Sequence, residues 1–323
     1  MGMAGFPGGW MTDNHVMSVL SPEFHWVSCP AQAPTGVPAH RMGVWQWGPD
    51  ADANGHVVVC VHGLTRQGRD FDALARQLRE RSPALTVLCP DIVGRGRSDW
   101  LSDSSGYQMP VYAVDVLNWL SERHARHPIT RLDWVGTSMG GVIGMILASQ
   151  SPASRPFPFT RLVLNDVGPS LPWAFVERLC TYVGQPLVFP NVEAGAQALR
   201  TISPGFGAHT DEDWLALSAP MFKPRDGGGV ELHYDPRIVE PIRQLTREVF
   251  EQSEALLWSL YDQITCPTLL LRGADSDVLT PATAQAMSDR GPRAQCLTFP
   301  QVGHAPTLVV SAQATPVVNW LLA

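Results

Sequence analysis

Several features that define common protein classes are missing from this chain of 323 residues. Its six cysteines contain no CxxC pair, so we expect free thiols in a reducing compartment rather than a disulfide framework. No HExxH or similar cluster of metal ligands is present, and no glycine-rich dinucleotide fingerprint follows the first buried strand. The sequence therefore predicts a protein that needs neither a metal ion nor an organic cofactor.

Positive charge is scarce as well. The 23 Lys and Arg residues are outnumbered by 30 Asp and Glu residues, which gives a formal net charge of −7. A negative protein is a poor partner for nucleic acid or for an anionic membrane surface. No window is long and apolar enough to span a membrane, and the N-terminus lacks the basic and apolar regions of a signal peptide. We expect a cytoplasmic protein that acts on a small molecule; its oligomeric state stays open.

The chain is rich in apolar residues, with 45% hydrophobic against 16% charged, which suits a thick core. Short apolar runs, typical of strands buried on both faces, alternate with helical periods. The strand-like runs cover residues 57–61, 86–89, 132–135, 161–169, 268–271 and 295–299, and Asp166 lies in the polar end of the fourth. Polar residues follow the ends of these runs. This order predicts an α/β fold with a mostly parallel, doubly wound sheet.

The rhythm changes in two segments. Residues 1–35 are rich in Gly, Pro and Met without clear periodicity, and we expect them to form an N-terminal arm. Residues 170–261 carry four helix-like stretches and many aromatic side chains, but no strand of the buried kind. We interpret this second segment as a helical cap insertion over the carboxyl edge of the sheet. Residues 36–169 and 262–323 then form the core that the insertion interrupts.

The segment 132–148 holds the strongest functional signal. A short apolar run leads into the motif G-T-S-M-G, centred on Ser138, and an apolar helix-like run follows. Strand, tight turn and helix with a serine at the turn is the setting in which G-x-S-x-G presents a nucleophile. The turn leaves almost no room for side chains at Gly136 and Gly140, and it forces the serine into a strained backbone conformation. Ser138 is therefore the candidate nucleophile.

A serine hydroxyl needs a base within hydrogen-bond reach, and the base needs a carboxylate to orient it. Of the ten histidines, only His304 follows the end of a strand beyond the serine, in a glycine-flanked loop. His62 ends the first buried strand, but it precedes the nucleophile, and we interpret it as a packing residue of its own turn. The backbone N–H of Leu64, just past that turn, is well placed to face an oxyanion.

These motifs together resemble the α/β-hydrolase superfamily with a helical cap. The resemblance covers about residues 40–323. It rests on His62-Gly63, on the serine motif with Gly141, on the Arg272-Gly273 strand end and on Gly303-His304. The superfamily hosts esterases, lipases, C–C hydrolases, amidases and non-hydrolytic members, so the fold alone does not name a substrate.

The resemblance implies a role for four residues. Ser138 would be the nucleophile and His304 the base that takes and returns its proton. The backbone N–H groups of Leu64 and Met139 would form the oxyanion hole. Neither a metal nor a cofactor takes part in this chemistry, which agrees with the missing metal and dinucleotide motifs.

The acid that would orient the base has no single candidate. In the superfamily it usually lies three residues after the strand-ending glycine, here Gly273, but that position is Ser276. Asp277 lies one step beyond it and Asp275 one step before, and neighbouring residues of an extended segment point to opposite sides. Some subfamilies instead place the acid after the strand that follows the nucleophile helix, where Asp166 stands. Asp166 and Asp277 remain alternatives, ahead of Asp275.

We predict a serine hydrolase that cleaves small to medium, largely apolar carboxylic esters through an acyl-enzyme. A cofactor-free C–C bond hydrolase or an acyltransferase would use the same residues, and a non-catalytic ligand-binding protein is a third interpretation. Because ligand sites have mostly apolar walls, we expect aromatic residues of the insertion to line a pocket above Ser138. The candidates are Trp173, Phe206, Phe222 and Trp258. The alternative is that these aromatics only pack the insertion onto the core.

Overall fold

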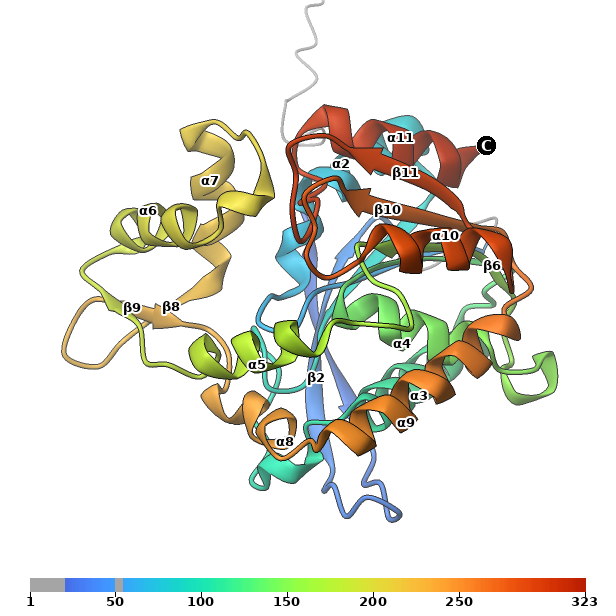
Figure 1. Ribbon diagram of the computed structural model, residues 1–323, viewed down its shortest axis with the longest axis horizontal. Helices are drawn as coiled ribbons and strands as arrows, with labels where there is room; N and C mark the ends of the chain where they lie inside the picture. The colour runs from blue at the N-terminus through green and yellow to red at the C-terminus, as the bar shows by residue number, and fades with distance from the viewer. Residues whose placement is uncertain (1–20, 50–54) are drawn as a thin grey trace, which may run out of the picture.

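The structure is a computed structural model that describes residues 21–49 and 55–323. Its centre is an eight-stranded sheet with the order β1-β2-β4-β3-β5-β6-β10-β11 (Figure 1). From β4 to β11 along this order all neighbours are parallel, whereas β2 is antiparallel to both β1 and β4. The strands are β1 Glu23–Cys29, β2 His40–Trp47, β3 His56–Val61, β4 Thr86–Asp91, β5 Arg131–Thr137, β6 Phe159–Asn165, β10 Thr268–Gly273 and β11 Gln295–Phe299. The predicted α/β fold with a mostly parallel sheet is confirmed.

Strand β1 lies within the segment 1–35 that the sequence pattern assigns to an arm. It pairs with β2 over its full length and forms the edge of the sheet. Most of its side chains are exposed or half-buried, so it lacks the continuous apolar run that identifies the inner strands. The sheet therefore begins before residue 36, which corrects the predicted boundary. Residues 1–20 of the predicted arm lie outside the described residues, as do residues 50–54.

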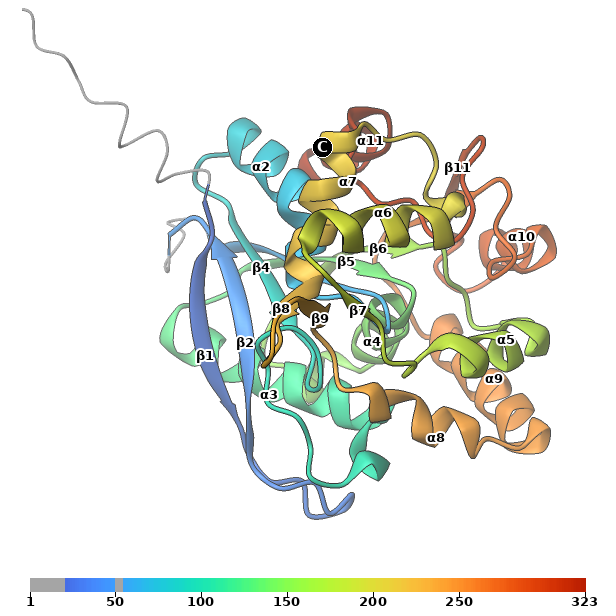
Figure 2. The ribbon, with the colours of Figure 1, turned by 90° about the vertical axis from the view of Figure 1, so that its left-hand side faces the viewer.

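Helices cover both faces of the sheet (Figures 1 and 2). On one face, α2 (Asp72–Arg81) and α11 (Ser311–Leu322) bury their apolar side chains in one core cluster. On the other face, α3 (Met109–Arg126), α4 (Met139–Ala148) and α10 (Pro281–Asp289) contribute to a second cluster. No helix in the described part of the chain is long and apolar enough to cross a membrane.

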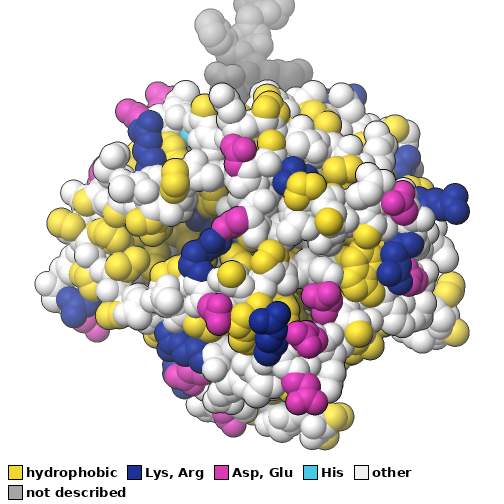
Figure 3. All heavy atoms as spheres, viewed as in Figure 1, with side chains coloured by type: hydrophobic (Ala, Val, Ile, Leu, Met, Phe, Trp, Pro, Cys, Tyr) yellow, Lys and Arg dark blue, Asp and Glu magenta, His cyan; other side chains and the backbone are white. Residues whose placement is uncertain are grey.

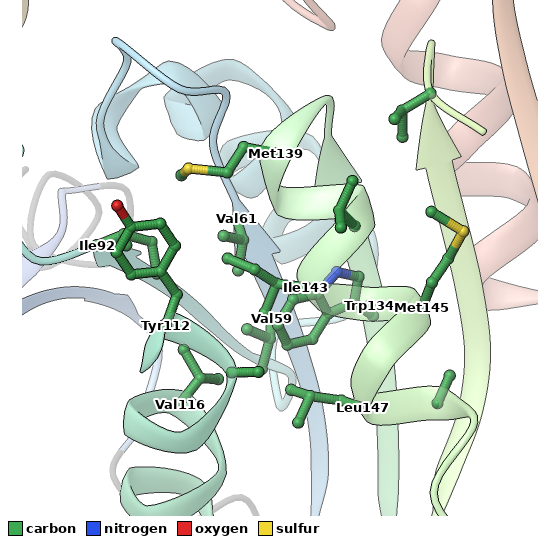
Figure 4. Packing of buried hydrophobic residues seen from close by; sticks show 14 of the residues in the cluster. Val59, Val61, Ile92, Tyr112, Val116, Trp134, Met139, Ile143, Met145 and Leu147 are labelled. Atoms are coloured by element: carbon green, nitrogen blue, oxygen red, sulfur yellow. The ribbon is translucent and has the colours of Figure 1, made fainter. Parts of the chain in front are cut away.

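The core behind α4 is closely packed, as Figure 4 shows. Trp134 of β5, Val59 of β3 and Ile143 of α4 are fully buried in the same cluster. The only polar atom of the Trp134 side chain, Nε1, donates a hydrogen bond of 3.0 Å to the carbonyl of Gly140. Dense packing around a satisfied polar group fixes the position at which α4 begins.

Between β6 and β10 the chain forms an additional layer (Figure 2). It contains α5 Trp173–Tyr182, α6 Val192–Ile202, α7 Asp211–Ser218, α8 Glu240–Arg243 and α9 Arg247–Asp262. It also contains a small antiparallel sheet of β7 Val188–Phe189, β8 Phe222–Pro224 and β9 Val230–Leu232. The sequence pattern does not reveal these strands, because two or three residues are too short to show an alternation.

The sequence pattern predicts one helix over residues 236–258, and the structure divides it in two. The stretch 236–258 is interrupted: α8 ends at Arg243, and α9 starts afresh behind Thr246, whose hydroxyl accepts a hydrogen bond from the N–H of Val249. The turn between β8 and β9 ends in consecutive glycines with left-handed φ values, and the first two, Gly227 and Gly228, have no atom within 4 Å of where a side chain would start.

Candidate active site

Ser138 occupies a sharp turn between β5 and α4. Its φ is 51° and its ψ −114°, a conformation that non-glycine residues rarely adopt. A side chain at Gly136 would start 2.3 Å from the carbonyl oxygen of Gly140, and one at Gly140 would start 2.0 Å from that of Val61. Both glycines are therefore required by close backbone approach, as the sequence motif indicates. The strain lifts the serine hydroxyl out of the helix, where it stays partly accessible.

His304 follows β11 and reaches the serine from the loop beyond that strand. Its Nε2 lies 3.1 Å from the Oγ of Ser138, and its Nδ1 lies 2.8 Å from the Oδ2 of Asp166. An ionised carboxylate can only accept, so Nδ1 carries the proton and Nε2 accepts from the hydroxyl. This is the geometry in which an imidazole can act as a base toward a serine.

Asp166 is the carboxylate that the structure brings to His304. It follows β6 directly and is completely buried. The N–H of Gly273 donates to its Oδ1 at 2.9 Å, and the hydroxyl of Ser276 donates to its Oδ2 at 2.6 Å. Every oxygen of the buried carboxylate thus has a partner, which offsets the cost of removing it from water. Ser276 occupies the position where the resemblance leads one to expect an acid, and there it supports the acid from the neighbouring strand.

The structure does not bring Asp277 or Asp275 to His304. The carboxylate of Asp277 is about half exposed and forms an ion pair with Arg178 of α5. This arginine, opposed by partial burial, lowers the pKa of Asp277. Asp275 is exposed and contributes its backbone N–H to the carbonyl of Val302. Of the three acids considered, the geometry singles out Asp166.

His62 is fully buried and has a different role from His304. The N–H of Ile92 donates to its Nε2 at 3.0 Å, so Nδ1 carries the proton and donates to the carbonyl of Gly63 at 2.7 Å. Burial lowers the pKa of His62 to about 3. A neutral imidazole with both nitrogens engaged holds the turn in place, in keeping with the packing role expected from its position in the sequence.

Leu64 and Met139 belong to the two segments that meet at the serine turn. In the described part of the chain, neither backbone N–H donates to another protein group, so both remain available to a ligand. The N–H of Gly140 donates to the carbonyl of His62 at 3.1 Å, which ties the start of α4 to the loop that carries Leu64. Two unpaired N–H groups held by a rigid turn could stabilise a negative oxygen formed at Ser138.

One group of metal-capable side chains lies together among the described residues, apart from this arrangement. It consists of Cys29, His40 and Asp115, all buried. Both ring nitrogens of His40 are hydrogen-bonded, Nε2 to Asp115 at 3.0 Å and Nδ1 to the carbonyl of Pro38 at 2.9 Å. Burial, and then the charge of Asp115, raise the pKa of the Cys29 thiol far above its usual value. These side chains satisfy one another without an ion.

The comparison with known families agrees with the geometry. The model of the alpha/beta hydrolase family matches residues 58–319, which include Leu64, Ser138, Asp166 and His304. This chain belongs to the alpha/beta hydrolase family. The hydrolase is 45% identical over 296 residues to a 3-hydroxybutyrate-oligomer hydrolase of Cupriavidus necator, with 91% of this chain and 95% of the relative covered.

Two further relatives of the hydrolase are more distant. It is 30% identical over 185 residues to the lipase LipV of Mycobacterium tuberculosis, and the match covers 56% of this chain and 60% of the lipase. Among solved structures, an alpha/beta hydrolase from Novosphingobium aromaticivorans superposes with a TM-score of 0.77 at 32% identity, covering 94% of this chain and 98% of that one. The fold of this chain is therefore shared with a solved alpha/beta hydrolase over nearly the whole length of both chains.

The aromatic residues predicted to line a pocket divide into two pairs. Phe206 stacks on Trp214 at 5.7 Å between ring centres, and Gly205 before it has no side chain, so its backbone packs against the loop of His304. Trp173 is half-buried and makes an edge contact with Phe250. Phe206 thus lies where the insertion meets the core, whereas Trp173 lies at the start of α5 and packs against α9.

Phe222 and Trp258 pack the insertion rather than face the serine. Phe222 is buried in a small cluster within the insertion, where it contacts Phe189 edge to face at 5.6 Å. The Nε1 of Trp258 donates to the hydroxyl of Ser170 at 2.7 Å, and Arg290 lies over its ring. For these two residues the alternative of structural packing fits the observed contacts better.

The aromatic side chain that does contact His304 is absent from the sequence-based candidates. Phe175 of α5 lies edge to face against the imidazole, with 5.7 Å between ring centres. It is only two positions from Trp173, and a sequence pattern cannot fix the rotation of a short helix that closely. The space-filling view shows hydrophobic side chains gathered in a hollow on the left of this face, between α5 below and α6 and α7 above (Figure 3).

Proposed function

We propose that this hydrolase cleaves the ester bonds of short 3-hydroxybutyrate oligomers, with Ser138 as nucleophile. The observation that carries the proposal is the continuous chain of contacts from Asp166 through His304 to Ser138, at 2.8 Å and 3.1 Å. The substrate class comes from the 3-hydroxybutyrate-oligomer hydrolase of Cupriavidus necator, because the identity of 45% extends over nearly the whole of both chains.

The proposed reaction begins when the Ser138 oxygen attacks the ester carbonyl while His304 takes its proton on Nε2. Asp166 stabilises the imidazolium that forms, and the N–H groups of Leu64 and Met139 hold the oxyanion. His304 then gives the proton to the departing alcohol, which leaves an acyl-enzyme on Ser138. Water activated by the same histidine attacks this ester and restores the serine, releasing the carboxylic acid.

We also infer that the insertion, residues 170–261, acts as a cap over this site. Two observations support the inference: Phe175 of α5 contacts His304, and the carbonyl of Gly205 accepts a hydrogen bond of 2.6 Å from the N–H of Gly303. An apolar cover excludes water from the developing charges and gives the methyl groups of the substrate a surface to bury.

The test is to incubate the purified protein with the 3-hydroxybutyrate dimer and trimer and to follow monomer release by chromatography. We expect release, and a loss of about 10⁴-fold or more in Ser138→Ala. A fluorophosphonate should label the wild type and leave Ser138→Ala unlabelled. Cleavage of p-nitrophenyl esters without cleavage of the oligomers would reject the substrate, whereas labelling that persists in the variant would reject the nucleophile.

A further inference from the structure

Arg66 is a cationic residue beside Ser138 that the proposed reaction does not use. It lies in the loop after β3, close to Gly63. A side-chain carbon placed on Gly63 would lie 3.6 Å from the Cγ of Arg66 and 3.8 Å from the Cβ of Ser138. The arginine stem and the serine side chain are therefore near neighbours across the small glycine.

The guanidinium of Arg66 is held in one orientation. Its Nε and Nη2 donate to the two carboxylate oxygens of Asp70 at 2.7 Å and 2.8 Å, and Nη2 also donates to the carbonyl of Leu217 at 3.2 Å. Nη1 makes no hydrogen bond within the described part of the chain, and about 15% of the side chain is exposed. A fixed guanidinium with one free nitrogen is preorganised to accept an anionic ligand, because little rotamer freedom remains to be lost.

The same guanidinium lies against the insertion. It is 5.7 Å from the ring centre of Phe206, and Leu217 belongs to the last turn of α7. The residue before Phe206, Gly205, is hydrogen-bonded to the loop of His304. The Arg66 side chain thus extends from a stem beside the serine to a guanidinium at the edge of the insertion, along the rim of the candidate active site.

A second arginine, Arg95, contacts the loop that carries Leu64. Asp70 matches the charge of Arg66, but the neighbouring Arg95 has no carboxylate within ion-pair distance among the described residues. Arg95 is fully buried, and its guanidinium donates to the carbonyl of Leu64 at 2.8 Å, to the carbonyl of Val93 and to the hydroxyl of Tyr112. An unmatched buried cation attached to the Leu64 loop favours an anion nearby, since little water screens it.

We propose that Nη1 of Arg66 binds the free carboxylate carried by the alcohol portion of the ester substrate. This rests on the proposed function, since in a 3-hydroxybutyrate oligomer one ester oxygen and two carbons separate the last ester carbonyl from the terminal carboxylate. That short link matches the nearness of Arg66 to Ser138. The contact selects the terminal ester bond of a free acid and gives the neutral ester of the same oligomer no comparable partner.

The test compares the free-acid trimer with its methyl ester in wild type and in Arg66→Gln. We expect wild type to favour the free acid, and Arg66→Gln to lose about 10- to 100-fold in kcat/KM for the free acid, the range of a charge-assisted hydrogen bond. For the methyl ester the change should stay within about threefold. The double variant Arg66→Gln/Asp70→Asn leaves no buried carboxylate unpaired and should show the same selectivity if the single variant proves unstable.

Arg69→Gln is the matched control. Arg69 pairs with Asp72 and lies over the ring of Trp45, so the same loss of charge three positions along the chain should leave the preference unchanged. Equal losses for free acid and methyl ester in both Arg66 variants would overturn the proposal and make Arg66 a structural residue. An equal preference for the free acid in wild type and variants would overturn it too.

A second pair of substrates separates this proposal from the identity of the oligomer. 3-Butanoyloxybutanoate and its methyl ester carry the carboxylate on the alcohol portion without being oligomers of 3-hydroxybutyrate. If wild type ignores the oligomers but prefers this free acid in an Arg66-dependent way, the proposed substrate fails and the role of Arg66 stands. If the oligomers are cleaved and neither pair shows Arg66-dependent preference, the substrate stands and the role of Arg66 fails.

Discussion

Two of the histidine–aspartate pairs in the described part of the chain have similar nitrogen–oxygen distances in very different places. His304 lies 2.8 Å from Asp166 at the carboxyl edge of the sheet, and His40 lies 3.0 Å from Asp115 between β2 and α3. Both aspartates are buried. Judged by the bond between histidine and carboxylate alone, either pair could orient a base.

The difference lies in what the second ring nitrogen meets. In His304 it accepts from the hydroxyl of Ser138, and 19% of the imidazole side chain is exposed. In His40 it donates to the carbonyl of Pro38, and only 4% of the side chain is exposed. A ring whose two nitrogens both face acceptors holds its protons, whereas a ring with a lone pair toward a hydroxyl can take one. The hydrogen bond to the carboxylate therefore sets the orientation of the imidazole ring. The partner of the second ring nitrogen decides whether the ring can accept a proton.

The largest expected effect tests this contrast directly. Asp166→Asn should lower kcat for ester hydrolysis by about 10⁴-fold, because an amide at this position favours the wrong tautomer of His304. Asp115→Asn should leave kcat within about tenfold of wild type, since the pair with His40 touches no reacting atom. Steady-state kinetics on a p-nitrophenyl ester would measure both. Similar losses in the two variants would remove the functional distinction between the pairs.

The free energy of unfolding should respond in the opposite way to kcat: we expect it to fall more when the His40–Asp115 pair is broken than when Asp166 is changed. Removing one partner of a buried ion pair costs about 3–5 kcal/mol, so Asp115→Ala should lower the free energy of unfolding by roughly that amount. The side chain also accepts a hydrogen bond of 2.8 Å from Gln32, which joins the loop after β1 to α3. Denaturant unfolding of Asp115→Ala beside Asp166→Asn would give the comparison. A loss below about 1 kcal/mol in Asp115→Ala would contradict it.

The pH dependence of the buried pair follows from the direction of the pKa shift. Burial lowers the pKa of His40, but hydrogen bonds to Asp115 and Pro38 outweigh it, and the pKa rises above the ordinary 6.5. The folded protein therefore holds this proton more tightly than the unfolded chain. The stabilisation is fully present below pH 6.5 and is lost as the pH rises through the folded pKa. The difference in Tm between wild type and His40→Gln should shrink over that range; a difference that grows with pH would refute the assignment.

A smaller effect on activity is expected at the contact between Phe175 and His304, which has no counterpart at His40 among the described residues. Phe175→Ala removes the ring against His304 and should lower kcat/KM by about tenfold, with a change in preference among acyl chain lengths. Phe222→Ala is the matched variant, because it removes a buried ring of the insertion that lies away from the histidine. It should reduce thermal stability and leave the chain-length profile unchanged. The reverse pattern would show that the wall of the site had been assigned to the wrong ring.

The smallest expected effect concerns Asp277, the candidate acid that does not contact His304. Asp277→Asn breaks an ion pair with Arg178 in which both side chains are about half exposed. Exposed pairs contribute about 0–1 kcal/mol, so stability and kcat should both stay close to wild type. A large loss of kcat in Asp277→Asn, with Asp166→Asn active, would reverse the choice of acid.

The residues that the sequence predicts well are those whose role is set by their immediate neighbours. Gly136 and Gly140 are required by the tight turn itself, and a serine between them at a strand–helix junction is typical of a nucleophile. The parallel sheet is equally local, since each buried strand reveals itself through its own apolar run. Strand β1 shows the limit: it lies at the sheet edge and carries no such run.

The choice between Asp166 and Asp277 could not be made from neighbours in the sequence. It depends on the register of β6 against β10, where Leu164 lies opposite Leu270, and this brings the residue after β6 to the N–H of Gly273. Register is set by packing of the whole sheet. The same limit explains why the sequence points to Trp173 rather than Phe175: the rotation of α5 about its axis is decided by what it packs against.

The glycine turn between β8 and β9 has a consequence for studying the insertion. A side-chain carbon added at Gly227 or Gly228 would have no other atom within 4 Å, so residues added there would not displace a neighbouring group. Exposed turn tips of this kind accept inserted segments with little loss of stability. A fluorophore or a short epitope joined between the two glycines would thus sit on the layer that carries Phe175 and Phe206. The molecule offers a place for an optical reporter of this layer, watched during turnover and without altering any residue of the site.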